Sequence, residues 1–340
     1  MQGIDIARVS SWLQTNVVGA TAPFEFELIA GGRSNLTYTV TDGDGQRFVL
    51  RRPPLAQVLA TAHDMAREHR IISAVGRTAV PVPKALAVCT EVDVNGAPFY
   101  VMSYVDGVVL DSPERAALLP VDLRPRVSEH LFDVLADLHA VDVDEVGLGD
   151  LAKREGYVER QVRRWSTQWE QSKTRELPAI DDVARRLRDH LPVQQGVSIA
   201  HGDFRFGNCL TNVDEGRIDA VLDWELCTLG DPLADLGYLG VYWHDGTAKT
   251  VRANDPTSAG GFPTYTDLVE RYARRTGRDI SGIGYYIAFG CWRLAVISEG
   301  VYSRYVHGAM GDGGDFDIAT FKESTDSLAT RALEAIEQWG

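Results

Sequence analysis

The sequence predicts an α+β protein with two lobes, an N-lobe built on an antiparallel sheet and a mainly helical C-lobe. Three observations lead to this prediction. The chain has 340 residues, more than the roughly 250–300 residues at which a single hydrophobic core stops growing. Short apolar and β-branched runs separated by turn residues fill most of residues 25–104, as expected for strands. After residue 105, apolar residues recur mainly at helical spacing.

The N-lobe is expected to comprise residues 1–104. Asp42-Gly43-Asp44-Gly45 predicts a hairpin turn between two of its strands, and Asn95-Gly96 predicts a second one. The expected elements are strands over 26–30, 36–40 and 48–51, a helix over 61–75, and strands over 85–92 and 98–104.

The C-lobe is expected to comprise residues 105–340 and to be mainly helical. Three short strands, over 197–200, 209–210 and 218–222, interrupt the helical pattern. The last two are joined by a turn-forming run at 212–216, so they form a hairpin. The expected helices span 127–140, 154–172, 181–191, 232–243, 264–276, 283–306 and 320–338.

Composition and charge bound the class of protein. Hydrophobic residues make up 44% and charged residues 24% of the chain, as in soluble globular proteins. The net charge of −14 argues against a nucleic-acid binder, which needs a basic surface. It allows a cationic substrate without requiring one. The expected partners are therefore small molecules.

Membrane and secretory signals are not expected. The first 17 residues lack a long apolar run, and the apolar segment 285–297 is interrupted by Arg293 and is too short to span a bilayer. The four cysteines form no CxxC pair, which favours free thiols in a reducing compartment. We therefore expect a cytoplasmic protein without a membrane segment.

The run from His201 to Asn208, followed by Asp223-Trp224-Glu225, carries the strongest functional signal. Asp203 precedes Asn208 by five residues, and Asp223 follows Asp203 by twenty. Phosphoryl transfer needs one carboxylate to orient the attacking hydroxyl, and an amide oxygen with a second carboxylate to hold magnesium. Magnesium prefers oxygen ligands. The predicted hairpin would carry Asp223 back beside Asn208, as two ligands of one metal require.

Two alternatives to this interpretation exist. Gly-Asp turns are common, Asn208 alone suits a turn, and Asp223 alone suits a helix N-cap. A zinc site formed by His201, Asp203 and Cys209 is the other alternative. Cys209 should alternate away from the loop, however, and no second Cys or His lies at ligand spacing.

These motifs resemble those of the aminoglycoside phosphotransferase family, the small-molecule branch of the protein-kinase-like fold. Within that family, the chain is most similar to the kinase-like domains related to those fused to some acyl-CoA dehydrogenases. Residues 230–236 and 157–165 share the resemblance, which extends over nearly the whole chain. It implies a bilobal protein-kinase-like fold, bound Mg²⁺, and ATP as phosphate donor with GTP as an open possibility. Asp203 would be catalytic, and Asn208 and Asp223 would bind the metal.

The resemblance also implies a phosphate-covering loop at Gly31, Gly32, Ser34 and Asn35. A glycine pair lets the backbone approach phosphates and offer N–H groups to them. The usual GxGxxG pattern is absent, and a plain hairpin turn is the alternative for this segment taken alone.

Arg51 stands where kinase-like folds usually have Lys on the third strand. Arginine keeps the charge but has a different reach and geometry, so we expect a reshaped site with Glu68 as the partner of Arg51. The alternatives are an exposed arginine and a solvated helix glutamate. Met102 and Tyr104 are expected to contact the base where the chain passes between the lobes, although core packing is an alternative for Met102.

The acceptor is the least defined part of the prediction. Arg205, Trp165, Tyr242 and Trp292 are candidates for acceptor contact, and core packing is the alternative for the aromatic residues. Asp231 and Asp235 are expected to cap or brace the helix that follows them. The arginines that would suit an anionic acceptor such as a CoA ester are Arg160, Arg163, Arg164, Arg293 and Arg304.

We therefore predict a Mg²⁺-dependent enzyme that moves the γ-phosphate of ATP or GTP to a hydroxyl of a small molecule, such as a hydroxyacyl-CoA or another metabolite. One alternative is an aminoglycoside antibiotic kinase, whose site should contain carboxylates facing amines. The other is a catalytically weak, nucleotide-binding partner of an acyl-CoA dehydrogenase.

Overall fold

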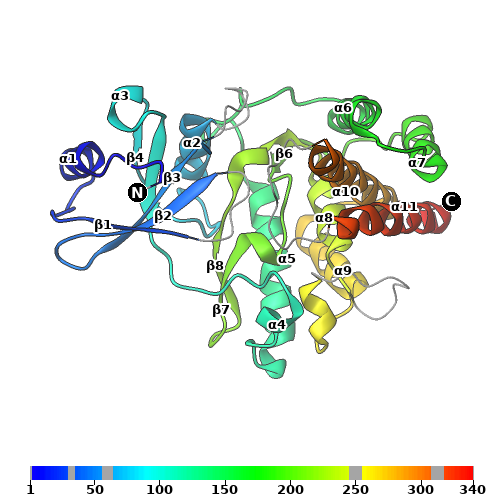
Figure 1. Cartoon of the computed structure of the whole chain (residues 1–340). Coiled ribbons are helices and arrows are strands. Elements are labelled where there is room, and N and C mark those ends of the chain that lie inside the picture. Colours follow the sequence, from blue (N-terminus) through cyan, green and yellow to red (C-terminus); the bar gives the residue numbers. More distant parts are fainter. Residues whose placement is uncertain (1, 30–34, 56–63, 245–254, 308–317, 340) are drawn as a thin grey trace.

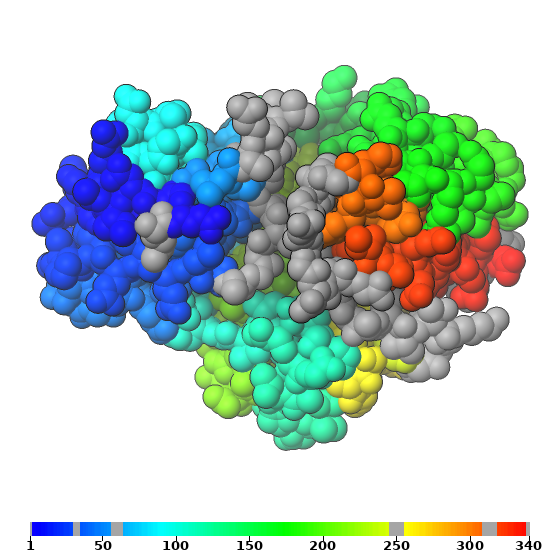
Figure 2. All heavy atoms as spheres, viewed as in Figure 1, coloured from blue at the N-terminus to red at the C-terminus, as the bar shows by residue number. Residues whose placement is uncertain are grey.

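The computed structural model describes residues 2–29, 35–55, 64–244, 255–307 and 318–339. It has the predicted mixed α+β architecture. Figure 1 shows an antiparallel sheet with helices α1, α2 and α3 at one end of the molecule and a group of helices at the other, with the β7–β8 hairpin between them. In the space-filling view, the first hundred residues gather on the left and helices α6, α7, α10 and α11 on the right (Figure 2).

The N-terminal part is built on one five-stranded antiparallel sheet with strand order β1-β2-β3-β5-β4. The aspartates at 5 and 64 cap α1 and α2 by accepting hydrogen bonds from backbone N–H groups in the first turn. The predicted loop residues Gly31, Gly32 and Ser34 lie outside the described residues. The elements are α1 (Ile6–Asn16), β1 (Glu25–Leu28), β2 (Leu36–Thr41), β3 (Arg47–Arg52), α2 (Met65–Val75), β4 (Ala85–Cys89), α3 (Val92–Asn95) and β5 (Phe99–Ser103).

The predicted turn at Asn95-Gly96 differs from the structure. The chain forms the one-turn helix α3 before it enters β5, and Gly96 ends that helix in the left-handed conformation with φ of 70°. Asn95 is buried, and its side-chain oxygen accepts a hydrogen bond from the Asp5 backbone N–H at 3.0 Å. The asparagine therefore serves a tertiary contact with the start of α1, which a local turn rule does not consider.

Helices and short hairpins make up the remainder of the chain. In Figure 1, helix α10 lies among α6, α8 and α11 and forms the centre of the helical group. The helices are α4 (Pro113–Ala116), α5 (Arg124–Ala140), α6 (Tyr157–Ser172), α7 (Pro178–Asp189), α8 (Pro232–Val241), α9 (Tyr265–Thr276), α10 (Ile283–Val306) and α11 (Ala319–Trp339). The strands are β6 (Ser198–Ala200), β7 (Cys209–Asn212), β8 (Arg217–Val221) and β9 (Thr228–Gly230), and the short 3₁₀ turns are η1 (Val121–Leu123), η2 (Phe206–Asn208), η3 (Trp224–Leu226) and η4 (Pro256–Ala259).

Two hydrophobic clusters hold these elements together. One lies between α1 and the sheet and includes Leu13 and Phe48. The other fills the helical part and reaches α2 and β5 through Ile72 and Met102. Because α2 and β5 share the second cluster, the side chains they carry are held against the loops of the helical part. Among the described residues, no helix combines the length and apolarity that a membrane crossing needs.

Close packing of α8 against α10 leads to a stability prediction. A methyl group added at Gly237 would lie 2.5 Å from the backbone of Tyr286, so Gly237→Ala should lower the free energy of unfolding by about 1–3 kcal/mol. Urea denaturation measures the change. Gly282→Ala is the matched control, because a methyl group there meets open space and the residue has an ordinary φ of −85°. Equal stability of the two variants would contradict the prediction.

Candidate active site

The loop after β6 is held by its first two residues. The buried His201 uses both ring nitrogens: Nε2 donates to the Leu222 carbonyl at 2.9 Å, and Nδ1 accepts from the Asp203 backbone N–H at 3.2 Å. Gly202 has φ of 83°, and a side chain there would meet the Leu226 carbonyl at 2.9 Å. The zinc alternative therefore lacks a free imidazole nitrogen, and His201 supports the loop.

Asp203 and Asn208 face each other across this loop. The Asn208 Nδ2 donates to the Asp203 side-chain Oδ2 at 2.6 Å and to the Asp203 carbonyl at 2.8 Å. The short 3₁₀ turn η2 sets their spacing. The Asp203 side chain is 20% exposed, so its carboxylate is reachable from outside the core. Because the side-chain nitrogen of Asn208 is engaged, its side-chain oxygen Oδ1 is the atom that can meet another ligand.

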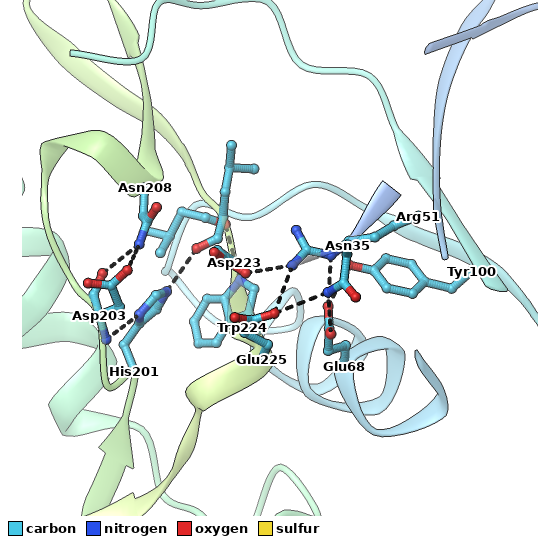
Figure 3. Close-up of polar contacts among 12 residues, drawn as sticks. Asn35, Arg51, Glu68, Tyr100, His201, Asp203, Asn208, Asp223, Trp224 and Glu225 are labelled. Atoms are coloured by element: carbon cyan, nitrogen blue, oxygen red, sulfur yellow. Dashed lines mark hydrogen bonds and ion pairs between the residues drawn. The ribbon is translucent and has the colours of Figure 1, made fainter. Parts of the chain in front are cut away.

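The β7–β8 hairpin brings Asp223 to this point, as the sequence predicts. Cys209 pairs with Val221 in the hairpin, and the Leu222 N–H donates to the Asn208 carbonyl at 2.8 Å. Asp223 has φ of 64° and is the only non-glycine residue with a positive φ among the described residues. Such strained backbone is found most often at functional sites. Figure 3 shows Asp223 between the Asp203–Asn208 pair and Arg51.

Arg51 occupies the centre of a charged cluster rather than an exposed strand position. Its Nε lies 3.2 Å from Glu68 Oε2, and its Nη2 lies 2.6 Å from Asp223 Oδ1. The Tyr100 hydroxyl donates to the same Glu68 oxygen at 3.1 Å. Burial acts to lower the pKa of Arg51, but the surrounding negative charges raise it overall, so the guanidinium stays charged. The predicted Arg51–Glu68 pair is thus present.

The same cluster contains one residue that the sequence interpretation missed. Glu225 places Oε2 3.6 Å from Arg51 Nη2 and 3.1 Å from the Asn35 side-chain nitrogen. Its position two residues after Asp223, with the buried Trp224 between them, was the available signal. The Asn35 side-chain nitrogen also lies 3.5 Å from Glu68 Oε1, and its buried Oδ1 has no hydrogen-bond partner among the residues that the structure describes. That orphaned oxygen marks a polar site open to a ligand.

Asp235 supports the loop at 201–208 rather than the helix that contains it. It accepts hydrogen bonds from the His201 N–H at 2.6 Å and the Gly202 N–H at 2.8 Å, and its Oδ2 lies 3.4 Å from His139 Nε2. Asp231 has the expected capping role, because it accepts from the Leu233 N–H at 3.0 Å. The prediction that Asp235 supports its helix was therefore wrong. Its carboxylate instead binds a loop that is remote in the sequence, and local capping rules do not consider such contacts.

A stability test follows from the two N–H groups that Asp235 accepts. An amide at Asp235→Asn has one acceptor oxygen for two backbone donors, so the free energy of unfolding should fall by about 1–3 kcal/mol. Burial acts to raise the pKa of Asp235, but hydrogen bonds from His139 and the Gly202 backbone lower it below 3.8 overall. The wild-type advantage should therefore hold above pH 3.8 and disappear as the pH falls through the lower folded value. Urea titrations at several pH values measure it. Asp150→Asn, at an exposed pair with Arg70, is the control and should change little.

The two residues expected at the nucleotide base lie at the end of β5. Met102 pairs with Val49 in the sheet and is buried, with 7% of its surface exposed. Tyr104 is half-buried just beyond the strand, and the Arg47 guanidinium lies 3.9 Å from its ring centre. Both residues therefore lie where the chain leaves the sheet for the helical part, and Met102 also contributes to the core.

The acceptor candidates separate into two groups. Arg205 Nε lies 3.3 Å from Asp203 Oδ1, and its guanidinium lies 4.9 Å from the Tyr242 ring centre. Trp165 is half-buried and lies 5.7 Å from the buried guanidinium of Arg293. Trp292, in contrast, is fully buried in the core. Its selection as an acceptor contact is corrected, because helical spacing alone does not tell a core aromatic from a pocket aromatic.

The expected arginine cluster is also divided. Arg293 is buried and donates to the Gly202 carbonyl in the loop at 201–208, while Arg304 is exposed on α10. The arginines of α6 instead line a surface hollow of about 420 Å³. The lining residues are Arg160, Arg163, Arg164, Thr167, Gln168 and Gln171.

The donor set at Asn208 and Asp223 fits Mg²⁺. Both side chains offer oxygen atoms, and the Arg51 guanidinium already lies against Asp223 as a cation would. In the described part of the chain, no three His, Cys, Asp or Glu side chains gather as a metal site. One carboxylate and one carboxamide are enough for Mg²⁺ where phosphates and water supply the remaining ligands.

Comparison with known proteins gives consistent matches. The model of the phosphotransferase enzyme family (APH) matches residues 25–268. Acyl-CoA dehydrogenase family member 10 of Mus musculus is 34% identical over 315 residues, which cover 91% of this chain and 29% of the mouse protein. The chain thus spans less than a third of that relative.

Solved structures share the fold. A Ralstonia eutropha protein provisionally described as an aminoglycoside phosphotransferase is 32% identical with a TM-score of 0.83, over 98% of this chain and 99% of that one. Aminoglycoside phosphotransferase APH(4)-Ia, in a complex with AMP-PNP and hygromycin B, is 17% identical with a TM-score of 0.60, over 95% and 98% of the two chains. The second likeness concerns the fold alone.

Proposed function

Because the chain belongs to the phosphotransferase enzyme family, we propose that it transfers the γ-phosphate of ATP to a hydroxyl group of a small molecule in a Mg²⁺-dependent reaction. The observation that supports this most directly is the meeting of Asp203, Asn208 and Asp223 around one loop and hairpin, with Arg51 beside them. The nucleotide held by the APH(4)-Ia neighbour supports a nucleoside triphosphate as the donor.

Asp203 orients the acceptor hydroxyl in this proposal. Its Oδ2 is fixed by the Asn208 amide, and its Oδ1 lies near Arg205, so the carboxylate has a defined orientation. In a loose transition state the hydroxyl proton leaves late. A carboxylate can therefore accept that proton without acting as a strong base.

Asn208 and Asp223 hold the divalent cation, and a bound Mg²⁺ would neutralise charge that develops on the phosphates. Arg51 has a fork of N–H groups that can grip a phosphate bidentately. The remaining nucleotide contacts that we propose are Gly31, Gly32, Ser34, Asn35, Glu68, Met102 and Tyr104.

The acceptor that we propose is an anionic metabolite such as a hydroxyacyl-CoA. Arg205 places a guanidinium beside the Asp203 carboxylate. Burial acts to lower the pKa of Arg205, but the negative charge of Asp203 helps to raise it overall, so the guanidinium stays charged. An aminoglycoside would bring several positive charges to the same place and would be repelled. The dehydrogenase name of the mouse relative also favours an acyl thioester.

One observation favours the alternative of a nucleotide-binding partner of an acyl-CoA dehydrogenase with weak catalysis. Arg51 engages the carboxylate that should hold the metal. All four cysteines are buried, and none forms a disulfide with another described residue, which fits a reducing compartment such as the cytoplasm.

A two-stage experiment tests the proposed function. Thermal shift with Mg²⁺ and either ATP or GTP should raise the melting temperature, and EDTA should cancel the effect. ADP release is then measured with a hydroxyacyl-CoA and with hygromycin B as acceptors. Release with the thioester alone supports the proposed acceptor. Stabilisation by nucleotide without ADP release would favour the weakly catalytic alternative, and the absence of both responses would refute the assignment.

A further inference from the structure

Arg51 connects the metal carboxylate with the nucleotide side of the site. Its side chain is only 12% exposed, and its guanidinium lies near three carboxylates that come from two segments of the chain. Glu68 belongs to α2, Asp223 follows β8, and Glu225 lies in η3. Figure 3 shows Arg51 reaching across from β3 to these groups. One cation thus balances part of the charge of three anions.

The contact with Asp223 conflicts with metal binding. Arg51 Nη2 lies 2.6 Å from Asp223 Oδ1, the distance of a charge-assisted hydrogen bond. A divalent cation on the same carboxylate would stand beside this guanidinium and be repelled by it. If the guanidinium left without replacement, Glu225 and Asp223 would lose their shared counter-charge. As long as no phosphate draws Arg51 away, its guanidinium therefore blocks the Asp223 carboxylate from binding a metal ion.

A nucleotide changes this balance because it brings several negative charges of its own. The two ends of the Arg51 fork hold different partners: Nε is near Glu68, and Nη2 is near Asp223. Nη2 can therefore turn to a phosphate while Nε stays on Glu68. The freed Asp223 then accepts the divalent cation, which in turn attracts the phosphates. Lysine has all its N–H donors on one nitrogen, so its partners must meet at one point, whereas the arginine fork holds its partners at separate nitrogens.

We propose, building on the function proposed above, that Arg51 couples metal and nucleotide binding. It keeps Asp223 in an ion pair until a phosphate binds to Arg51. The two ligands then bind cooperatively, and by linkage each tightens the other by the same factor. Arg51 is in this sense a positioning residue for the metal ligand as well as a phosphate contact.

The first test measures binding of Mn²⁺ alone, followed by the loss of its free EPR signal, to nucleotide-free protein. Arg51→Met should bind Mn²⁺ about tenfold more tightly than wild type, within the usual range of coupling between sites. Arg51→Lys should show a smaller gain. Arg67→Met removes a neighbouring guanidinium that donates to the Cys227 carbonyl. Among the described contacts, Arg67 has none with Asn208 or Asp223, so this variant should keep Mn²⁺ affinity near the wild-type value.

The second test asks where the gained affinity resides. In the double variant Arg51→Met with Asp223→Ala, the gain should disappear, because the carboxylate that was opened is gone. A fluorescent ATP analogue then gives nucleotide affinity with and without Mg²⁺. The factor by which Mg²⁺ tightens the nucleotide should be about 5- to 150-fold in wild type and should shrink in Arg51→Met.

Three outcomes would overturn the coupling: no gain in Arg51→Met, an equal gain in Arg67→Met, or a gain that survives loss of Asp223. Arg51→Lys keeps a cation beside the buried Glu68 and serves as the folded variant if Arg51→Met unfolds, with the same criteria. Failure of the proposed function itself looks different. In that case Asp223→Ala alone would bind Mn²⁺-nucleotide as tightly as wild type does.

Discussion

Asp203→Asn is expected to lower kcat by about 10²- to 10⁴-fold, the usual contribution of a positioned general base. The amide has nearly the same shape but cannot accept the hydroxyl proton. The hydrogen bond from Asn208 to the carbonyl of residue 203 remains available, so the loop should keep its conformation. The affinity for the magnesium–nucleotide complex should therefore stay within about twofold of the wild-type value, a change in binding free energy well below 1.4 kcal/mol.

Steady-state ADP release and binding of a fluorescent nucleotide measure the two effects separately. Asp150→Asn makes the same chemical change at an exposed pair with Arg70 and should leave both parameters unchanged. If Asp203→Asn turned over at the wild-type rate, the catalytic assignment would be wrong. If it lost nucleotide binding as severely as turnover, Asp203 would be a binding or folding residue instead.

Asp223→Ala should abolish the magnesium-dependent part of nucleotide binding. The substitution removes the one carboxylate of the donor set and also frees Arg51 from its 2.6 Å contact. Isothermal titration with the nucleotide should give the same affinity in Mg²⁺ and in EDTA. An unchanged metal dependence would show that Asp223 is not a ligand.

The strained backbone at this position provides an internal control. At φ of 64°, alanine is less favourable than glycine by about 1–2 kcal/mol. Asp223→Gly should therefore be more stable than Asp223→Ala in urea titrations, while both lose the metal response equally. If the more stable Asp223→Gly kept more of the magnesium response than Asp223→Ala, the loss in Asp223→Ala would come from misfolding and not from the missing carboxylate.

Local sequence patterns account for much of the observed structure. The alternation and turns before residue 105 predicted the sheet strands to within a few residues, because pleated strands and tight turns depend on near neighbours. The pairing of Arg51 with Glu68 was also predictable, since the family resemblance supplied a strand and a helix that face each other. Asp203, Asn208 and Asp223 could be selected because their spacing is set by one loop and one hairpin.

Long-range contacts decided what the patterns could not. Asp235 has the sequence context of a helix residue, yet its carboxylate holds the loop at His201 and Gly202. Trp292 follows the same helical spacing as the pocket candidates, yet lies in the core. The two Asn35 contacts, to Glu68 and Glu225, join segments more than thirty residues apart.

The sequence alone thus predicted the mixed α+β architecture and selected Asp203, Asn208 and Asp223 as candidates, because both depend on residue type and short spacing. Only the tertiary structure decided that Arg51 contacts Asp223, that Glu225 also lies near Arg51, and that Arg205 lies beside Asp203. The reason is that charge balance in a site depends on distances between elements remote in the chain. A one-dimensional pattern records which charges are present but not which of them meet.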